Sequence, residues 1–449
     1  MSEEEQKKNR NLDLTQGSPL KTILLFSIPL LIGQLFHLLY TLVDTRMVGQ
    51  LLGEVQLAAV GSTTTVCDML IGFVNGVTNG FAIVLARFYG AKDKKGVRKS
   101  FGLSAVYGVI LALVLSGLCL LFRGTILSFL QVPKSLWENA QAYLSIIAAG
   151  LLMTALYNIG ASALRAIGDS VMPLLFLILS SVVNIGLDYL FMAVIPMGVG
   201  GAAFATVLSQ GISAVCCLTY IRRKYSILHI TGQDIRFDKS MTKKLLESGI
   251  GMGFMISFVQ LGTVALQVTI NTFDQAVIVA HTAARKATSL FMLPFSTLGS
   301  ALATYAGQNK GAGLYDRIKQ GLKRTVLLTW IWCGIVFAIS LAFAPAITKL
   351  ISASANPVVL QTAARYLRIN TAFYFVTAVI CIFRNTMQGL GDTRTPVLSS
   401  SMELVGKILI ACFLAPQIGY FGIIIAEPIV WFIMVIPLCV NIRKCFNNN

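Results

Sequence analysis

The chain has 449 residues, of which 55% are apolar and only 12% are charged, and its mean hydropathy is +0.74. A soluble protein could not bury that much apolar surface, so the composition excludes a water-soluble fold. The net charge of +17 would suit a nucleic-acid partner in a soluble chain. We expect no such partner here, because the basic residues fall in short stretches between long apolar runs.

Apolar runs of membrane-spanning length recur along the whole sequence. A helix needs roughly 20 apolar residues to cross a hydrocarbon core of about 30 Å. We therefore predict an all-α integral membrane protein with twelve transmembrane helices. The predicted spans are residues 20–44, 55–84, 100–122, 137–163, 172–194, 199–222, 246–271, 276–306, 321–343, 360–388, 395–416 and 419–441.

Basic residues are distributed unevenly between the two sides that these spans define. The side that holds both termini carries 26 of the 36 Lys and Arg residues, and the other side carries six. Lys and Arg concentrate in cytoplasmic loops of membrane proteins, so we predict that both termini are cytoplasmic. The segments on this side are 1–21, 85–99, 164–171, 222–245, 307–324, 389–394 and 442–449.

Short motifs recur in the two halves of the chain. Ala166-Ile-Gly-Asp-Ser-Val-Met-Pro173 matches Gly389-Leu-Gly-Asp-Thr-Arg-Thr-Pro396, with Gly, Asp and Pro at the same places in both. Gly90-Ala-Lys92 matches Gly311-Ala-Gly313 at nearly the same offset along the chain. Self-similarity of this kind indicates an internal repeat.

Each copy of the repeat contains six spans, an even number, so both copies enter the membrane with the same orientation. We predict two six-helix bundles, at 1–221 and 246–449, joined by a cytoplasmic linker at 222–245. Parallel bundles can enclose a cleft that opens to either side, which is typical of secondary transporters. No nucleotide-binding loop, zinc-protease motif or dinucleotide fingerprint occurs, so we do not expect an enzyme.

Ionisable and polar residues within spans indicate an ion site in the N-terminal bundle. Asn184 and Asp188 lie one turn apart on span five and share a face. Asp44 closes span one, and Thr206 lies near the outer start of span six. At about 1.5 Å per residue, all of them fall in the outer half of the membrane. Such oxygens suit Na⁺ or a shared proton; alternatively, Asp44 merely ends its helix near the surface.

The C-terminal bundle carries cations within its spans instead. Lys286 and Arg384 lie in spans eight and ten, and Glu403 and Lys407 lie one turn apart on span eleven. We interpret Glu403 and Lys407 as a neutralising ion pair, because an unpaired charge in lipid is costly. The repeat gives Lys407 the position of Asn184. The bundles are therefore expected to differ, with ion coupling in the first and substrate contact or anchoring in the second.

Pro29 lies inside span one, fifteen residues before Asp44. A proline within a helix removes a backbone hydrogen bond and can bend the helix. The residue pattern leaves two interpretations open, a static kink or a bend that responds to the charge on Asp44.

These motifs resemble those of the multidrug and toxic compound extrusion (MATE) family, in particular its DinF-like bacterial branch. The resemblance covers nearly the whole chain. It rests on Ile28-Pro29, Leu39-Tyr40-Thr-Leu-Val-Asp44, Gly90-Ala-Lys92, Leu164-Arg-Ala-Ile-Gly-Asp169, Asn184-x-x-x-Asp188, Gly201-Ala-Ala-Phe-Ala-Thr206 and Gly307-Gln-Asn-Lys-Gly-Ala-Gly313.

The resemblance implies twelve helices in two bundles forming a V, and export of amphipathic organic cations in exchange for Na⁺ or H⁺. The family's first-bundle ion site matches Asp44, Asn184, Asp188 and Thr206, with Tyr40 nearby. Some branches place functional carboxylates in the second bundle. Spans eight to ten contain no acidic residue here, which favours the first bundle.

We therefore expect a multidrug antiporter of the bacterial cytoplasmic membrane, monomeric, with small organic cations as substrates, no cofactor and no metal beyond Na⁺ at the coupling site. Two alternatives remain open. Lys286, Arg384 and Lys407 would suit an organic-anion exporter. A lipid-linked saccharide flippase has a related architecture, but that group typically has two further helices.

Overall fold

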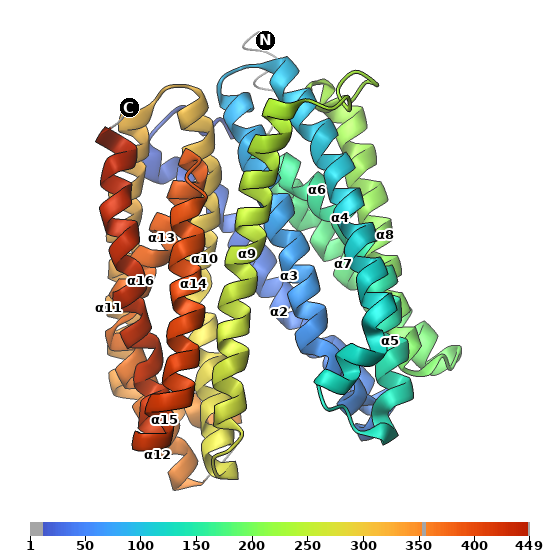
Figure 1. The fold of residues 1–449 in the computed structure, drawn as a ribbon, viewed down its shortest axis with the longest axis vertical. Coiled ribbons are helices and arrows are strands. Elements are labelled where there is room, and N and C mark those ends of the chain that lie inside the picture. The colour runs from blue at the N-terminus through green and yellow to red at the C-terminus, as the bar shows by residue number, and fades with distance from the viewer. Residues whose placement is uncertain (1–11, 353–355, 448–449) are drawn as a thin grey trace. The chain divides into compact units, whose positions relative to one another are not determined.

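The computed structural model describes residues 12–352 and 356–447, and every regular element in those ranges is a helix (Figure 1). The chain divides into two compact units. Unit 1 contains Ile28–Gly253, and unit 2 contains Thr15–Ser27 and Phe254–Asn449. Two helices pass from one unit to the other, α2 (Pro19–Leu51) and α9 (Lys239–Ile270).

The remaining elements belong to a single unit each. Unit 1 holds α3 (Glu54–Gly90), α4 (Lys94–Phe129), η1 (Lys134–Leu136), α5 (Trp137–Ala149), α6 (Leu151–Ala166), α7 (Val171–Tyr189), η2 (Leu190–Val194), α8 (Gly198–Lys224) and η3 (Ser226–Leu228). Unit 2 holds α10 (Gln275–Gly311), α11 (Tyr315–Ser352), α12 (Pro357–Ala372), α13 (Tyr374–Leu390), α14 (Arg394–Leu409), η4 (Ile410–Leu414), α15 (Ala415–Ile418) and α16 (Tyr420–Asn447).

The helices confirm the predicted membrane-spanning pattern. Among the described residues, 10 helices are long and apolar enough to cross a membrane, and counting each of two bent helix pairs as one span gives 12. The first pair is α5 and α6, bent by 41°, and the second is α12 and α13, bent by 55°. Predicted spans four and ten are therefore each built from two helices that meet at a bend.

Local backbone features recur in the two copies of the sequence repeat. The helix pairs break at Gly150 and at Phe373, which correspond to each other when the two Gly-Asp motifs are aligned. The glycines of those motifs, Gly168 and Gly391, have φ values of 92° and 89°. Only glycine adopts this left-handed conformation without strain, so the repeat preserves the turn as well as the helices.

Helix α2 is longer than the predicted first span. It continues to Leu51, so Asp44 lies about two turns before its end and does not close it. Polar residues shortened the apolar run in the sequence, but they do not interrupt helical hydrogen bonding. Pro29 lies within the continuous helix, next to the point between Ser27 and Ile28 where α2 passes from unit 2 into unit 1.

The first half of α9 packs against α3 with direct backbone contact. A Cβ atom added at Gly80 would lie 2.3 Å from the carbonyl oxygen of Ser248, and one at Gly76 would lie 2.7 Å from the Cα atom of Gly253. The Ser248 hydroxyl also donates a hydrogen bond of 2.8 Å to the Gly80 carbonyl. The small residues of α3 thus set the distance between the two helices.

Polar contacts attach the start of α9 to α4. The Lys99 ammonium lies 2.6 Å from the Asp238 carboxylate, and this hydrogen bond lowers the pKa of Asp238. The hydroxyls of Tyr107 and Thr242 are 2.6 Å apart. The end of the segment predicted as a linker, 222–245, is therefore held against α4 of unit 1.

Gly80→Ala is expected to destabilise the protein, because the new methyl group would meet backbone atoms that cannot rotate away. Overpacking of this kind typically costs about 1–3 kcal/mol. Thermal unfolding of the purified protein in detergent measures the effect. Gly61→Ala on the same helix is the control, since a Cβ there meets nothing within 4 Å. Equal melting temperatures for the two variants would contradict the close packing of α3 and α9.

Candidate functional site

Two polar side chains of α7 and one of α8 meet within unit 1. Asn184 and Asp188 are 1% and 0% exposed. The hydrogen-bond network places the Asn184 amide nitrogen toward Asp188, where it donates to Oδ2 at 2.9 Å. The Asn184 amide oxygen then accepts from the backbone nitrogen of Thr206 at 3.2 Å. The structure thus brings together three of the residues singled out in the sequence.

Helix α2 completes this set, which we call the carboxyl pair site (Asp44, Asn184, Asp188, Thr206 and Tyr40). The side chains of Asp44 and Asp188 are in hydrogen-bond contact, as are those of Tyr40 and Thr206. All five residues lie in unit 1, on α2 and on the consecutive helices α7 and α8.

The carboxyl pair is incompletely satisfied by the protein. One oxygen of each group, Oδ1 of Asp44 and Oδ1 of Asp188, is buried and has no hydrogen-bond partner among the residues that the structure describes. Ionised carboxylates are acceptors only, so two of them in contact repel each other unless a proton or a cation lies between them. The geometry therefore defines a place where a small cation or a proton can be held.

Backbone features explain how α7 and α8 approach closely enough to form this site. The α7 helix ends one residue after Asp188 and continues as the π-helical turn η2; such turns are frequent at functional sites. A Cβ at Gly201 would lie 2.7 Å from the carbonyl oxygen of Phe191 in that turn. Glycine at the start of α8 therefore lets Thr206 reach Asn184.

Asp68 is an intramembrane acid that the sequence analysis overlooked. It lies on α3, within a membrane-spanning segment, and close enough to His37 of α2 for electrostatic attraction. The side chains of both residues are exposed. An acidic residue near the middle of a predicted span was the available signal, since such residues are rare and functional by default.

Unit 2 contains the ion pair predicted on span eleven. The Lys407 ammonium lies 2.9 Å from the Glu403 carboxylate. The Arg384 guanidinium of α13 lies 3.3 Å from the other oxygen of the same carboxylate. All three side chains are at most 8% exposed. Lys286, the fourth charge predicted here, is exposed and forms no ion pair in the described ranges.

Two further residues extend this cluster, which we call the unit 2 ion network (Arg285, Arg384, Glu403, Lys407 and Glu427). The Arg285 guanidinium lies 2.7 Å from Glu427 Oε1, and Lys407 Nζ is 3.8 Å from the same oxygen. The hydroxyl of Tyr366 donates to Glu427 Oε2 at 3.1 Å.

Glu427 was not among the residues predicted from the sequence, although the internal repeat indicates that it occupies the position of Thr206. Gly422 lies near the start of the last helix as Gly201 lies near the start of α8. Alignment of these glycines places Gly422-x-x-x-x-Glu427 on Gly201-x-x-x-x-Thr206, and Lys407 aligns with Asn184 as predicted. The unit 2 ion network therefore occupies, in its own unit, the repeat-related position of the carboxyl pair site.

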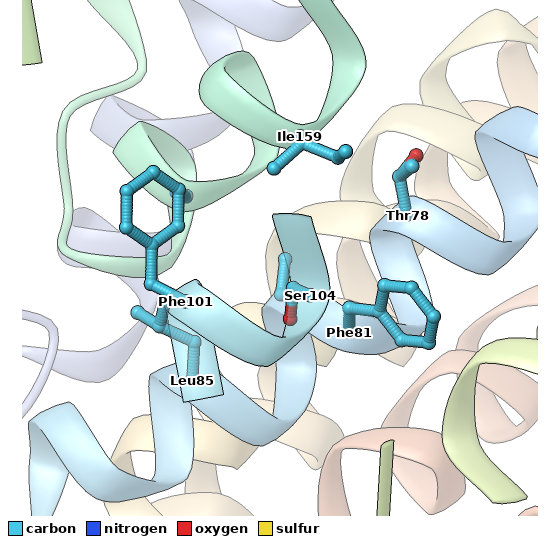
Figure 2. A pocket seen from close by; sticks show the side chains of 8 residues that line it. Thr78, Phe81, Leu85, Phe101, Ser104 and Ile159 are labelled. Carbon is cyan, nitrogen blue, oxygen red and sulfur yellow. The ribbon is translucent and has the colours of Figure 1, made fainter. Parts of the chain in front are cut away.

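A small cavity of about 10 Å³ lies elsewhere in unit 1, between α3, α4 and α6 (Figure 2). Its lining is mostly apolar, with Phe81, Leu85, Phe101 and Ile159 among the residues around it. A volume of that order admits about one water molecule. We interpret it as a packing gap, since it is far too small for an organic substrate.

Two repeated helical units with ionisable groups inside their spans define a multi-pass membrane transporter. The sequence matches the MatE family model twice, over residues 29–190 and 252–413, and the two matches are offset along the chain as the Gly-Asp motifs are, which confirms the internal repeat. The chain belongs to the MATE family of transporters. As a family member it is a transporter and not an enzyme, as predicted, while its assignment to the DinF-like branch stays a prediction.

Individual proteins of known sequence or structure agree with this assignment. The probable multidrug resistance protein YpnP of Bacillus subtilis is 30% identical over 306 residues, which cover 68% of each chain. The probable multidrug resistance protein YoeA of the same organism is 26% identical over 393 residues, covering 86% of this chain and 84% of the relative. A crystal structure described as MATE in the bent conformation is 23% identical, with a TM-score of 0.87 and coverage of 98% and 99% of the chains.

Glu403→Gln is expected to destabilise unit 2, because it leaves Lys407 and Arg384 without their shared carboxylate. Removing one partner of a buried ion pair typically costs about 3–5 kcal/mol. Thermal unfolding in detergent again reports the change. Glu247→Gln, at an exposed residue of α9, should leave the melting temperature unchanged. The account of the network is wrong if both variants melt like the natural chain.

Proposed function

We propose that this MATE family transporter is an antiporter that exports amphipathic organic cations by alternating access, in exchange for H⁺ or Na⁺ bound at the carboxyl pair site. The observation that carries the proposal is the contact between Asp44 and Asp188, with one buried oxygen of each lacking a partner. In an apolar interior this arrangement requires a bound proton or cation, which is what a coupling site has to hold and release.

The neighbours of the two carboxyl groups support the same role. Asn184 holds one oxygen of Asp188, while Thr206 contacts Tyr40. The Asn184 amide thus orients the Asp188 carboxyl group, which suits a site where the ion is the exchangeable part. Of the two ions, the direct contact between the carboxyl groups favours H⁺, because a single proton can join them.

A cationic substrate follows from the charges of unit 1. Asp44, Asp68 and Asp188 are acidic residues within its spans, and His37 is the neighbour of Asp68. Acidic groups in a low-dielectric surrounding attract organic cations, and a coupling ion competes with them through the same charge. The names of the Bacillus relatives, as probable multidrug resistance proteins, support a range of small-molecule substrates.

The remaining parts of the proposal concern placement in the cell. We propose that the chain works as a monomer in the bacterial cytoplasmic membrane, with both termini in the cytoplasm and without a cofactor. The distribution of 26 of the 36 basic residues on one side supports this orientation. Pro29 lies where α2 passes between the units, which makes that helix suited to bend when the ion at Asp44 changes.

Asp44→Asn is expected to abolish gradient-driven export, because it removes one of the two carboxyl groups that hold the coupling ion. The measurement is efflux of a fluorescent organic cation from pump-deficient bacteria, with Na⁺ and pH gradients imposed separately. We expect efflux by the natural chain under the pH gradient and at most background efflux by the variant.

Asp274→Asn is the matched control, since Asp274 is exposed at the start of α10 and should leave efflux unchanged. Membrane levels of all three proteins are compared by immunoblot. Efflux by Asp44→Asn at the natural rate would exclude the carboxyl pair as the coupling site. Dye retention unchanged by the natural chain under either gradient would exclude the export of organic cations.

A further inference from the structure

The unit 2 ion network contains more positive than negative charge. Three cationic side chains, Arg285, Arg384 and Lys407, are paired with two carboxylates, Glu403 and Glu427. The network therefore carries one positive charge in excess, within helices of membrane-spanning length.

The surrounding groups do not balance this excess. The hydroxyl of Tyr366 donates to Glu427, and the ring of His281 packs against Tyr366 with centroids 5.3 Å apart. His281 also lies 3.1 Å from the hydroxyl of Tyr420. These are neutral partners that satisfy hydrogen bonds but bring no negative charge. Because an uncompensated charge inside a membrane protein is costly, the network is one anion short as far as the described residues go.

Accessibility distinguishes the three cations. The side chain of Arg285 is 31% exposed, whereas those of Arg384 and Lys407 are 8% and 3% exposed. Both buried cations are already bonded to Glu403. Arg285 is therefore the member of the network that a ligand can reach.

The chemistry of Arg285 also suits an anion. A guanidinium has five N–H donors in a planar fork, and Nη1 donates to Glu427. The fork matches a carboxylate in a bidentate arrangement, which a lysine ammonium cannot reproduce. Glu427 holds the guanidinium in one orientation, so the remaining donors are preorganised.

We propose that Arg285 binds a carboxylate, or a comparably compact anionic group, of the transported molecule. The proposal rests on the proposed export function and deepens its substrate class, because among amphipathic organic cations it expects those that also carry an anionic group to bind more tightly. Unit 1 has carboxyl groups that lack a cation, and unit 2 has, at the repeat-related position, cations that lack an anion. The two copies of the repeat thus recognise opposite charges.

The test compares the binding of two probes to the purified full chain in detergent, measured by fluorescence anisotropy. Rhodamine B carries a free carboxylate, and rhodamine B ethyl ester carries the same ring system without it. Arg285→Gln is expected to weaken rhodamine B binding about tenfold, as for loss of a charge-assisted hydrogen bond, and to leave ester binding unchanged. The variant should fold, because it leaves two cations and two carboxylates in the network.

Two further variants separate the effect of Arg285 from general charge. Lys286→Gln removes the adjacent exposed cation, which lies outside the network, and should change neither affinity. Arg285→Lys keeps the positive charge but lacks the planar fork of N–H donors. Its affinity for rhodamine B should lie between those of the natural chain and Arg285→Gln. The inference is overturned if Arg285→Gln weakens both probes equally or neither, or if Lys286→Gln has the same selective effect.

An anionic lipid headgroup presents similar chemistry, so a second arm repeats the binding in nanodiscs of phosphatidylcholine with and without phosphatidylglycerol. Equal affinity for rhodamine B in the two kinds of nanodisc supports Arg285 as part of a substrate site. Loss of rhodamine B binding on addition of phosphatidylglycerol assigns Arg285 to lipid and overturns the inference.

Gradient-driven efflux of the ester by the natural chain tests the proposed export function separately, because the ester lacks the group that Arg285 would bind.

Discussion

Two carboxyl groups in contact inside a membrane-spanning unit impose a strict electrostatic condition. Asp44 and Asp188 cannot both be ionised there without a proton or a cation between them. Much of the surrounding structure serves this contact. The π-helical turn after α7 and the glycine at 201 bring α7 and α8 together, and the amide of Asn184 fixes Asp188. Oδ1 of each carboxyl group has no hydrogen-bond partner in the described part of the chain. We therefore propose that occupancy by an ion changes the stability of this arrangement and that this dependence drives the transport cycle.

The same repeat position in unit 2 has the opposite electrostatic character. Lys407 stands where unit 1 has Asn184, and Glu427 stands where unit 1 has Thr206. An ammonium tethered to the chain lies close to both Glu403 and Glu427, so unit 2 has a permanent cation where we propose an exchangeable one for unit 1. A duplicated bundle has thus diverged into two chemically distinct halves while its bends and left-handed glycines have been retained.

Much of this account could be predicted from the sequence. The apolar runs indicated the spans, and the recurring Gly-Asp motifs indicated the repeat, because both depend on local patterns. The spacing of Asn184 and Asp188 placed them on one face, and the depth of Asp44 grouped it with them. The contact itself depends on how separate helices pack, which the residue pattern does not specify. Glu427 was missed because acidic residues were sought in spans eight to ten and not at the position aligned with Thr206. The length of α2 was underestimated because polar residues end an apolar run without ending a helix.

If the carboxyl pair releases its ion when substrate binds, that release can be measured directly. A weakly buffered solution of the purified protein in detergent is mixed with a saturating organic cation while protons are followed with a pH indicator and Na⁺ with a radioactive tracer. We expect the natural protein to release one cation per chain and the Asp44→Asn, Asp188→Asn double variant to release none, provided that the variant still binds the organic cation. Equal release by both proteins would contradict it, because the ion would then come from another site.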